Sequence, residues 1–259
     1  TLLSKVIKFE RVERNIQAGF IEALAVTASG YTSGESVSFY EGLDSLKNWE
    51  HPHRLGVRTK LGLEHLMASS AIPALFPAVK INREFFGDGA IRQLAPLSPA
   101  IQLGADRILA VGVSSKVPRP IKGSEPPHPS LTQILAHILN SAFVDTLTMD
   151  SEVLRRYNKM VPLISEEQAE KDRDLRIRPI QLLDITPSEN LNEIASEYFD
   201  DLPRALKLFI RDAGSSTVLS LLLFEKSYCG RLIDLGYNDA MEKEAEILEF
   251  FRDDQAGAS

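Results

Sequence analysis

The sequence of 259 residues is poor in several residue types, and each shortage excludes a class of protein. Its single cysteine, Cys229, cannot form an internal disulfide, which favours a reducing compartment and predicts a cytoplasmic protein. The longest mainly apolar run, Val218 to Phe224, is too short to span a bilayer. Basic residues are also scarce, with 29 Lys and Arg against 36 Asp and Glu, and the net charge of −7 argues against a nucleic-acid partner.

Sequence motifs of cofactor and metal sites are absent as well. Neither GxGxxG nor GxxxxGKS/T occurs, so no dinucleotide or phosphate-binding loop is predicted. There is no HExxH, and His51 and His53 lack a third ligand at a useful spacing, which favours a solvent-exposed loop. We therefore predict neither a metal nor an organic cofactor.

The apolar pattern that is present predicts an α/β protein. A proline-rich stretch over 117–129 is interpreted as a joint, which predicts two parts, 1–117 and 118–259, the second packing on the first. Residues 84–113 are predicted to form a βαβ unit, because the apolar run Arg107 to Val113 is typical of a central parallel strand covered on both faces. Helices are expected over 2–19, 61–72, 97–103, 131–147 and from about 190 onward, and strands over 23–27, 37–40, 78–81, 84–86, 107–113 and 180–185.

One pair of glycines, Gly30 and Gly34, has the spacing of a nucleophile elbow, with Thr32 in the middle position. An elbow lies between a strand and a helix, but the residues that follow, Ser36 to Tyr40, have the pattern of a strand. A hairpin turn is therefore preferred to an elbow, and the same context argues against Ser36 as a nucleophile.

The strongest local signal is the loop Gly87-Asp88-Gly89-Ala90, which follows an apolar strand. Loops at the carboxyl ends of strands are where α/β proteins build their sites, and flanking glycines allow close approach to the carboxylate. The alternative is an Asp-Gly turn without chemistry.

The ordered motifs from about 23 to 113 resemble the patatin-like phospholipase family. The resemblance implies a three-layer α/β/α fold with a mainly parallel central sheet, here lacking its N-terminal strands, and a helical C-terminal region. The motifs are Ala25-Val-Thr-Ala28, Thr32-Ser-Gly-Glu35, Val37-Ser-Phe39, the segment Met67 to Val79, Phe86 to Ala90, Leu94 to Leu97, and Leu103 to Asp106 leading into Ile108 to Val113.

By this resemblance, the protein hydrolyses acyl esters of lipids with a Ser–Asp dyad, and Asp88 is the general base. Gly87, Gly89 and Ala90 form the loop around it. The family's GxSxG serine and its glycine-rich oxyanion loop are both absent from residues 1–259. We therefore expect an N-terminal segment or another chain to supply them, and we expect this chain alone to be inactive.

Other interpretations of these patterns remain open. The runner-up is a non-catalytic lipid-binding or regulatory protein with Asp88 as a turn residue, and a weaker one is an unrelated α/β binding module. The predicted helix 131–147 and the run Val218 to Phe224 are suited to an acyl pocket or a lipid surface, although packing as core is preferred. The acidic balance argues against strong attraction to anionic membranes. We therefore expect contact with a membrane surface to be transient.

Overall fold

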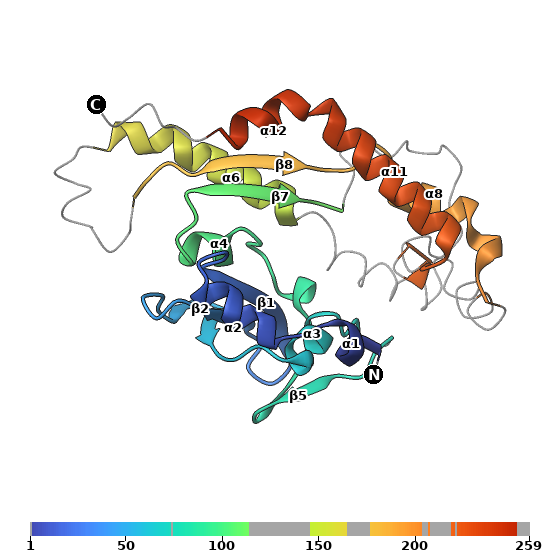
Figure 1. Cartoon of the computed structure of the whole chain (residues 1–259), viewed down its shortest axis with the longest axis horizontal. Helices are drawn as coiled ribbons and strands as arrows, with labels where there is room; N and C mark the ends of the chain where they lie inside the picture. The colour runs from blue at the N-terminus through green and yellow to red at the C-terminus, as the bar shows by residue number, and fades with distance from the viewer. Residues whose placement is uncertain are drawn as a thin grey trace, which may run out of the picture. The chain divides into compact units, whose positions relative to one another are not determined.

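The computed structural model describes residues 2–73, 75–113, 146–164, 177–203, 207, 219–220 and 222–252. The chain folds as two compact units, one formed by Thr1–Asp106 with Thr146–Pro179 and the other by Arg107–Asp145 with Ile180–Ser259 (Figure 1). The boundary predicted near residue 117, most of the helix predicted over 131–147, and part of the apolar run 218–224 lie outside the described residues.

The first unit contains a six-stranded sheet in the order β3-β4-β2-β1-β6-β5. Only β2 and β4 pair in parallel, and the other neighbours are antiparallel. The predicted strands over 23–27, 37–40, 78–81 and 84–86 are all present. The bounds are β1 Ala23–Gly30, β2 Ser36–Gly42, β3 Trp49–His51, β4 Arg54–Arg58, β5 Val79–Ile81 and β6 Glu84–Asp88.

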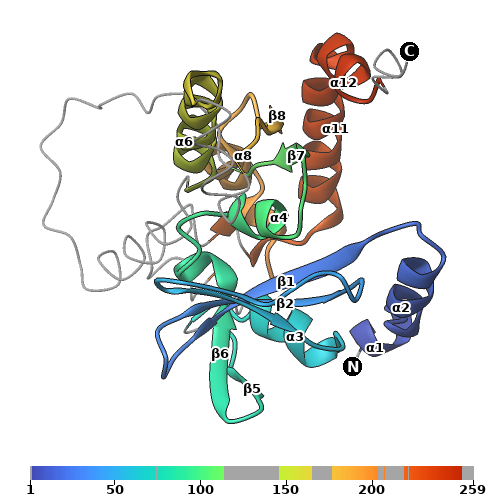
Figure 2. The same ribbon diagram turned by 90° about the vertical axis from the view of Figure 1, so that its left-hand side faces the viewer.

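Helix α3 (Leu63–Ser69) packs against one face of this sheet. The core between them consists of apolar side chains that alternate along β1, β2 and β6, as expected for strands with one face on a helix. Helix α4 (Ser98–Gln102) lies on the other side of β1 (Figure 2). The remaining elements of this unit are α1 Leu2–Val6, α2 Glu10–Gln17, the 3₁₀ turn η1 Gly89–Ile91, α6 Thr146–Met160 and η2 Val161–Leu163.

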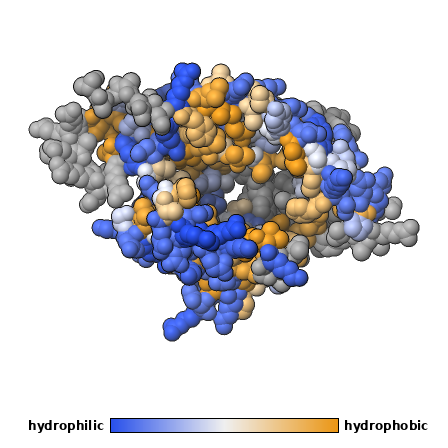
Figure 3. All heavy atoms as spheres, in the orientation of Figure 1, coloured by the Kyte–Doolittle hydropathy of each residue, from blue (hydrophilic) through white to orange (hydrophobic). Residues whose placement is uncertain are grey.

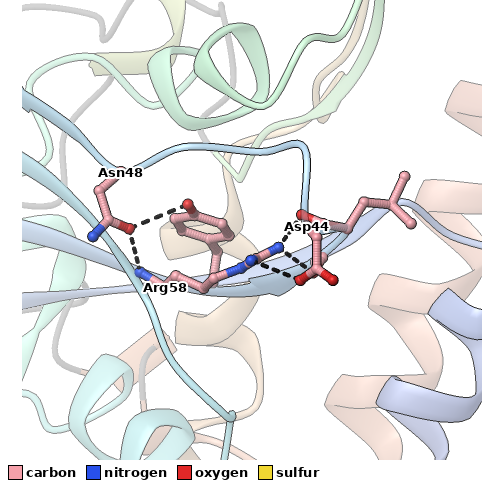
Figure 4. A network of polar contacts seen from close by, with 6 residues as sticks. Asp44, Asn48 and Arg58 are labelled. Carbon is pink, nitrogen blue, oxygen red and sulfur yellow. Dashed lines mark hydrogen bonds and ion pairs between the residues drawn. The ribbon is translucent and has the colours of Figure 1, made fainter.

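The loop that follows β2 is held by Arg58 at the end of β4 (Figure 4). Its guanidinium donates to the carboxylate of Asp44 at 3.0 Å and to the carbonyls of Gly42, at 2.7 Å, and Leu43. The backbone N–H of Arg58 donates to Oδ1 of Asn48 at 2.8 Å. These bonds satisfy carbonyl groups that the loop would otherwise leave without partners.

The second unit combines a parallel pair of strands with helices. Strand β7 (Arg107–Val111) pairs with β8 (Gln181–Ile185), and helix α12 (Glu244–Phe250) contacts β8. A separate apolar core joins α8 (Leu191–Glu197) and α11 (Lys226–Glu242), with the 3₁₀ turn η4 (Phe199–Asp201) beside it. In Figure 3 apolar residues gather over the region of β7 and β8.

The structure confirms an α/β protein but corrects two details of the prediction. Strands β6 and β7 lie in different sheets, so residues 84–113 do not form a βαβ unit. The reason is that β6 is already paired on both edges, with β1 and with β5, which leaves no edge for β7. Strand β7 is also not covered on both faces, because Ile108 and Ala110 are buried whereas the side chain of Val111 is 71% exposed. The described six-stranded sheet is mainly antiparallel, because only β2 and β4 pair in parallel.

No helix in the described parts of the chain is both long enough and apolar enough to cross a membrane.

Candidate active site

Asp88 is the last residue of β6 and begins the turn η1. Its backbone N–H donates to the carbonyl of Ala71 at 3.0 Å, which ties the end of the strand to the segment after α3. Its Oδ1 accepts a hydrogen bond from the backbone N–H of Ala90 at 2.9 Å. The residue is only 9% exposed, so the carboxylate is held in one position inside the unit.

The two glycines beside Asp88 allow backbone and side chains to approach closely. A side chain at Gly89 would collide with the backbone carbonyl of Thr27 on β1, and a side chain at Gly87 would collide with the ring of Tyr31. The buried hydroxyl of Ser29 donates to the carbonyl of Gly89 at 3.3 Å. Gly89 therefore has a firm packing reason, because it meets backbone, whereas at Gly87 the half-exposed ring of Tyr31 could move aside.

Burial raises the pKa of Asp88, because desolvation disfavours the charged carboxylate. The hydrogen bond from Ala90 acts in the opposite direction but does not cancel this effect. Within the described parts of the chain, Asp88 forms no ion pair with a Lys, Arg or His that would lower its pKa. The carboxylate is thus a stronger base than an exposed aspartate.

No serine hydroxyl of the described residues is hydrogen-bonded to Asp88. Of the buried serines on β1 and β2, Ser29 bonds to the carbonyl of Gly89 and Ser38 bonds to the hydroxyl of Thr27 at 3.0 Å. Neither of these two hydroxyls is bonded to the carboxylate of Asp88. A serine supplied from outside residues 1–259 stays a prediction.

The segment Gly30 to Gly34 is a hairpin turn between β1 and β2, as predicted, and not a nucleophile elbow. The N–H of Gly34 donates to the carbonyl of Gly30 at 3.1 Å, and Gly34 has a φ of +69°, which favours glycine. The carboxylate of Glu84 accepts the backbone N–H groups of Thr32 at 2.9 Å and Ser33 at 2.6 Å. The sequence contains no local signal for this contact, because Glu84 lies on a different strand.

His51 and His53, the two histidines considered as metal ligands, take part in a side-chain contact and a turn. His51 on β3 contacts Gln102 of α4, with 3.0 Å between Nε2 of each side chain, and His53 occupies the turn before β4 with a φ of 61°. Within the described ranges, no group of three His, Cys, Asp or Glu side chains is placed to hold a metal ion.

Two polar residues with defined contacts were not predicted from the sequence, the buried His65 and the half-buried Asp150. His65 on α3 stacks edge-on against Phe39 at 4.9 Å, and its Nδ1 accepts the N–H of Gly62 at 3.0 Å. Asp150 on α6 accepts the N–H of Leu97 at the start of α4 at 2.8 Å. Burial lowers the pKa of His65 and raises that of Asp150. A lone polar residue in an apolar helix pattern gives no indication of either contact.

Comparison of the chain with models of protein families, with curated proteins and with solved structures found no match in any of the three.

Proposed function

We propose that this chain is the base-carrying part of a patatin-like acyl-ester hydrolase with a three-layer α/β/α fold. Asp88 is the general base of a Ser–Asp dyad, and a polypeptide segment outside residues 1–259 supplies the serine and the oxyanion donors. The observation that carries the proposal is a buried carboxylate of raised pKa at a strand end, which forms no ion pair with the described residues and precedes a glycine packed on the neighbouring strand. The substrate is a lipid ester, met at a membrane surface on the cytoplasmic side.

The geometry of Asp88 suits the transfer of a proton. The Ala90 N–H fixes one carboxylate oxygen, so the other oxygen is available to a serine hydroxyl. That oxygen accepts the proton as the serine attacks the ester carbonyl and returns it to the leaving alcohol. A pKa raised by burial brings the carboxylate nearer to the value that such a base needs at neutral pH.

The proposal predicts that Asp88→Asn in the assembled protein lowers p-nitrophenyl butyrate hydrolysis by a factor of about 10² to 10⁴, the usual contribution of a general base. Asparagine keeps the bond to Ala90 but cannot take the proton. Asp150→Asn is the matched control, because Asp150 also accepts one backbone N–H and also has a pKa raised by burial. Its rate should stay within a few-fold of the wild type, and equal rates for Asp88→Asn and the wild type would refute the proposal.

One observation favours the alternative of a non-catalytic lipid-binding or regulatory protein. The hydrogen bond from Ala90 to Asp88 is the contact that a simple turn residue would make. Under this alternative, Asp88→Asn preserves both the fold and lipid-vesicle binding, and the assembled protein shows no ester turnover that depends on Asp88.

A further inference from the structure

The two edges of β1 are unequally paired. On one side β2 pairs with the strand along Ala23 to Ser29, whereas on the other side β6 reaches only Ala28 to Gly30. The first five residues of β1, Ala23 to Thr27, therefore have no strand beside them on the β6 side among the described residues. Burial follows the same division, since Ala28, Ser29 and Gly30 are buried and no residue from Ala23 to Thr27 is.

The direction of the hydrogen bonds identifies which residues face this edge. The carbonyl of Glu22 accepts from Leu43, and the N–H of Gly30 donates to Glu35, so even-numbered residues of β1 bond towards β2. Groups of successive residues alternate between the two sides of an antiparallel strand. The N–H groups of Ala23, Ala25 and Thr27 therefore point to the β6 side. Gly89 already packs on Thr27, so Ala23 and Ala25 are the residues that face the open edge.

A cleft of about 710 Å³ runs along this same edge. Ala23, Ala25 and Thr27 line one wall, and the wall opposite is formed by α4 and its flanks, with Pro96, Ala100 and Leu103. Most of the lining side chains are small or apolar and leave room beside the strand, and Glu22 and Gln93 are the two large polar ones. Unpaired strand edges of this kind bind extended polypeptide segments by forming main-chain hydrogen bonds.

We propose that this cleft binds an extended polypeptide segment, which adds a strand to β1 beyond the end of β6. The added strand continues the β1–β6 interface on the same edge, so one of its ends lies beside the Asp88 turn, where Gly89 already packs on Thr27. Backbone groups that need partners favour a peptide over an acyl chain, because a hydrocarbon would leave them unpaired. The inference goes beyond ester hydrolysis and does not require it, although such a strand is a route by which a serine reaches Asp88.

Hydrogen exchange on the full chain provides the first test. Without a partner, the amides of Ala23 and Ala25 should exchange much faster than those of Leu24 and Val26, which bond to β2. An eight-residue peptide of alternating valine and threonine, with a lysine at each end, should then slow the two odd-numbered amides and leave the other two unchanged. Odd-numbered amides that are already protected in the free chain would overturn the proposal.

Binding of the same peptide, followed by fluorescence anisotropy, provides the second test. Ala100→Trp fills the cleft from α4 without changing the backbone of β1, and it should weaken binding at least tenfold. A peptide methylated on every backbone nitrogen is the matched control and should not bind, because neither of its edges can then pair with β1. Binding of dodecanoate but not of the peptide would make this an acyl cleft, and protection that depends on protein concentration would make it a contact between copies. Either result, or no peptide binding at all, overturns the proposal, whereas loss of esterase activity alone does not.

Discussion

A single buried carboxylate determines both the proposed chemistry and part of the stability of the first unit. Because burial raises the pKa of Asp88, the folded state binds its proton more tightly than the unfolded state does. The bound proton therefore contributes to the free energy of unfolding. This contribution is complete below the unfolded pKa of Asp88 and is lost as the pH rises through its folded pKa. At neutral pH the ionised Asp88 therefore destabilises the fold.

Asp88→Asn should consequently stabilise the chain at pH 7 by about 0.5 to 2 kcal/mol, the range of single substitutions that relieve a functional strain. Asparagine retains an oxygen acceptor for the Ala90 N–H and carries no charge. Urea denaturation at pH 7 measures the change, and the gain should shrink as the pH falls through the folded pKa of Asp88, because the aspartate itself then becomes neutral. Asp88→Ala, which loses the acceptor, is the control, and a less stable Asp88→Asn would contradict the argument.

His65 should give the opposite pH dependence. Burial lowers its pKa in the folded state, so the unfolded chain binds the proton more tightly, and stability falls as the pH drops below about 6.5. The loss is at most about 1.4 kcal/mol per pH unit for one proton. His65→Asn, which offers an acceptor to the Gly62 N–H without titrating, should remove this part of the difference in unfolding free energy between pH 7 and pH 5. An unchanged difference would show that His65 does not cause it.

At the scale of elements, local sequence predicted the hairpins well and the long-range pairing poorly. Asn82, with a φ of 53°, and the turn from Gly30 to Gly34 define hairpins through a few neighbouring residues. In contrast, the predicted single helix over 2–19 is interrupted between α1 and α2, where Phe9 packs against the core of the sheet. The sheet to which β7 belongs also depends on partners distant in sequence. The Asp88 loop was identified from its local pattern, but its burial depends on Ala71 and distant strands.

The contact between Glu84 and the β1–β2 turn is another pairing of this long-range kind, and it should stabilise the hairpin. Desolvation acts to raise the pKa of Glu84, but hydrogen bonds from Ser33 and Thr32 outweigh it and lower the pKa. Glu84→Ala should therefore cost about 1 kcal/mol in the free energy of unfolding at pH 7, with Glu84→Gln intermediate. The effect should disappear in acid, as the pH falls through the folded pKa. Glu50→Ala, at an exposed strand glutamate on β3, is the control, and an equal loss there would refute a specific role for Glu84.

At the scale of the whole molecule, each unit has its own sheet and its own apolar core. Phe39 belongs to the core beneath the six-stranded sheet, and Leu223, which is 1% exposed, belongs to the core around α8 and α11. Separate cores predict two unfolding transitions, because each set of buried side chains is lost with its own unit.

Phe39→Ala and Leu223→Ala should therefore act on different transitions in scanning calorimetry. Each removes a large buried side chain, at a cost of about 2 to 5 kcal/mol to the unit that holds it. Phe39→Ala should lower one midpoint temperature and Leu223→Ala the other, and the double variant should show both shifts unchanged, each in its own transition, because sites without shared contacts behave independently. A single transition lowered by both substitutions would show instead that the two cores unfold together. In that case a strand bound beside β1 would stabilise the whole chain, whereas with separate transitions it stabilises only the unit that contains Asp88.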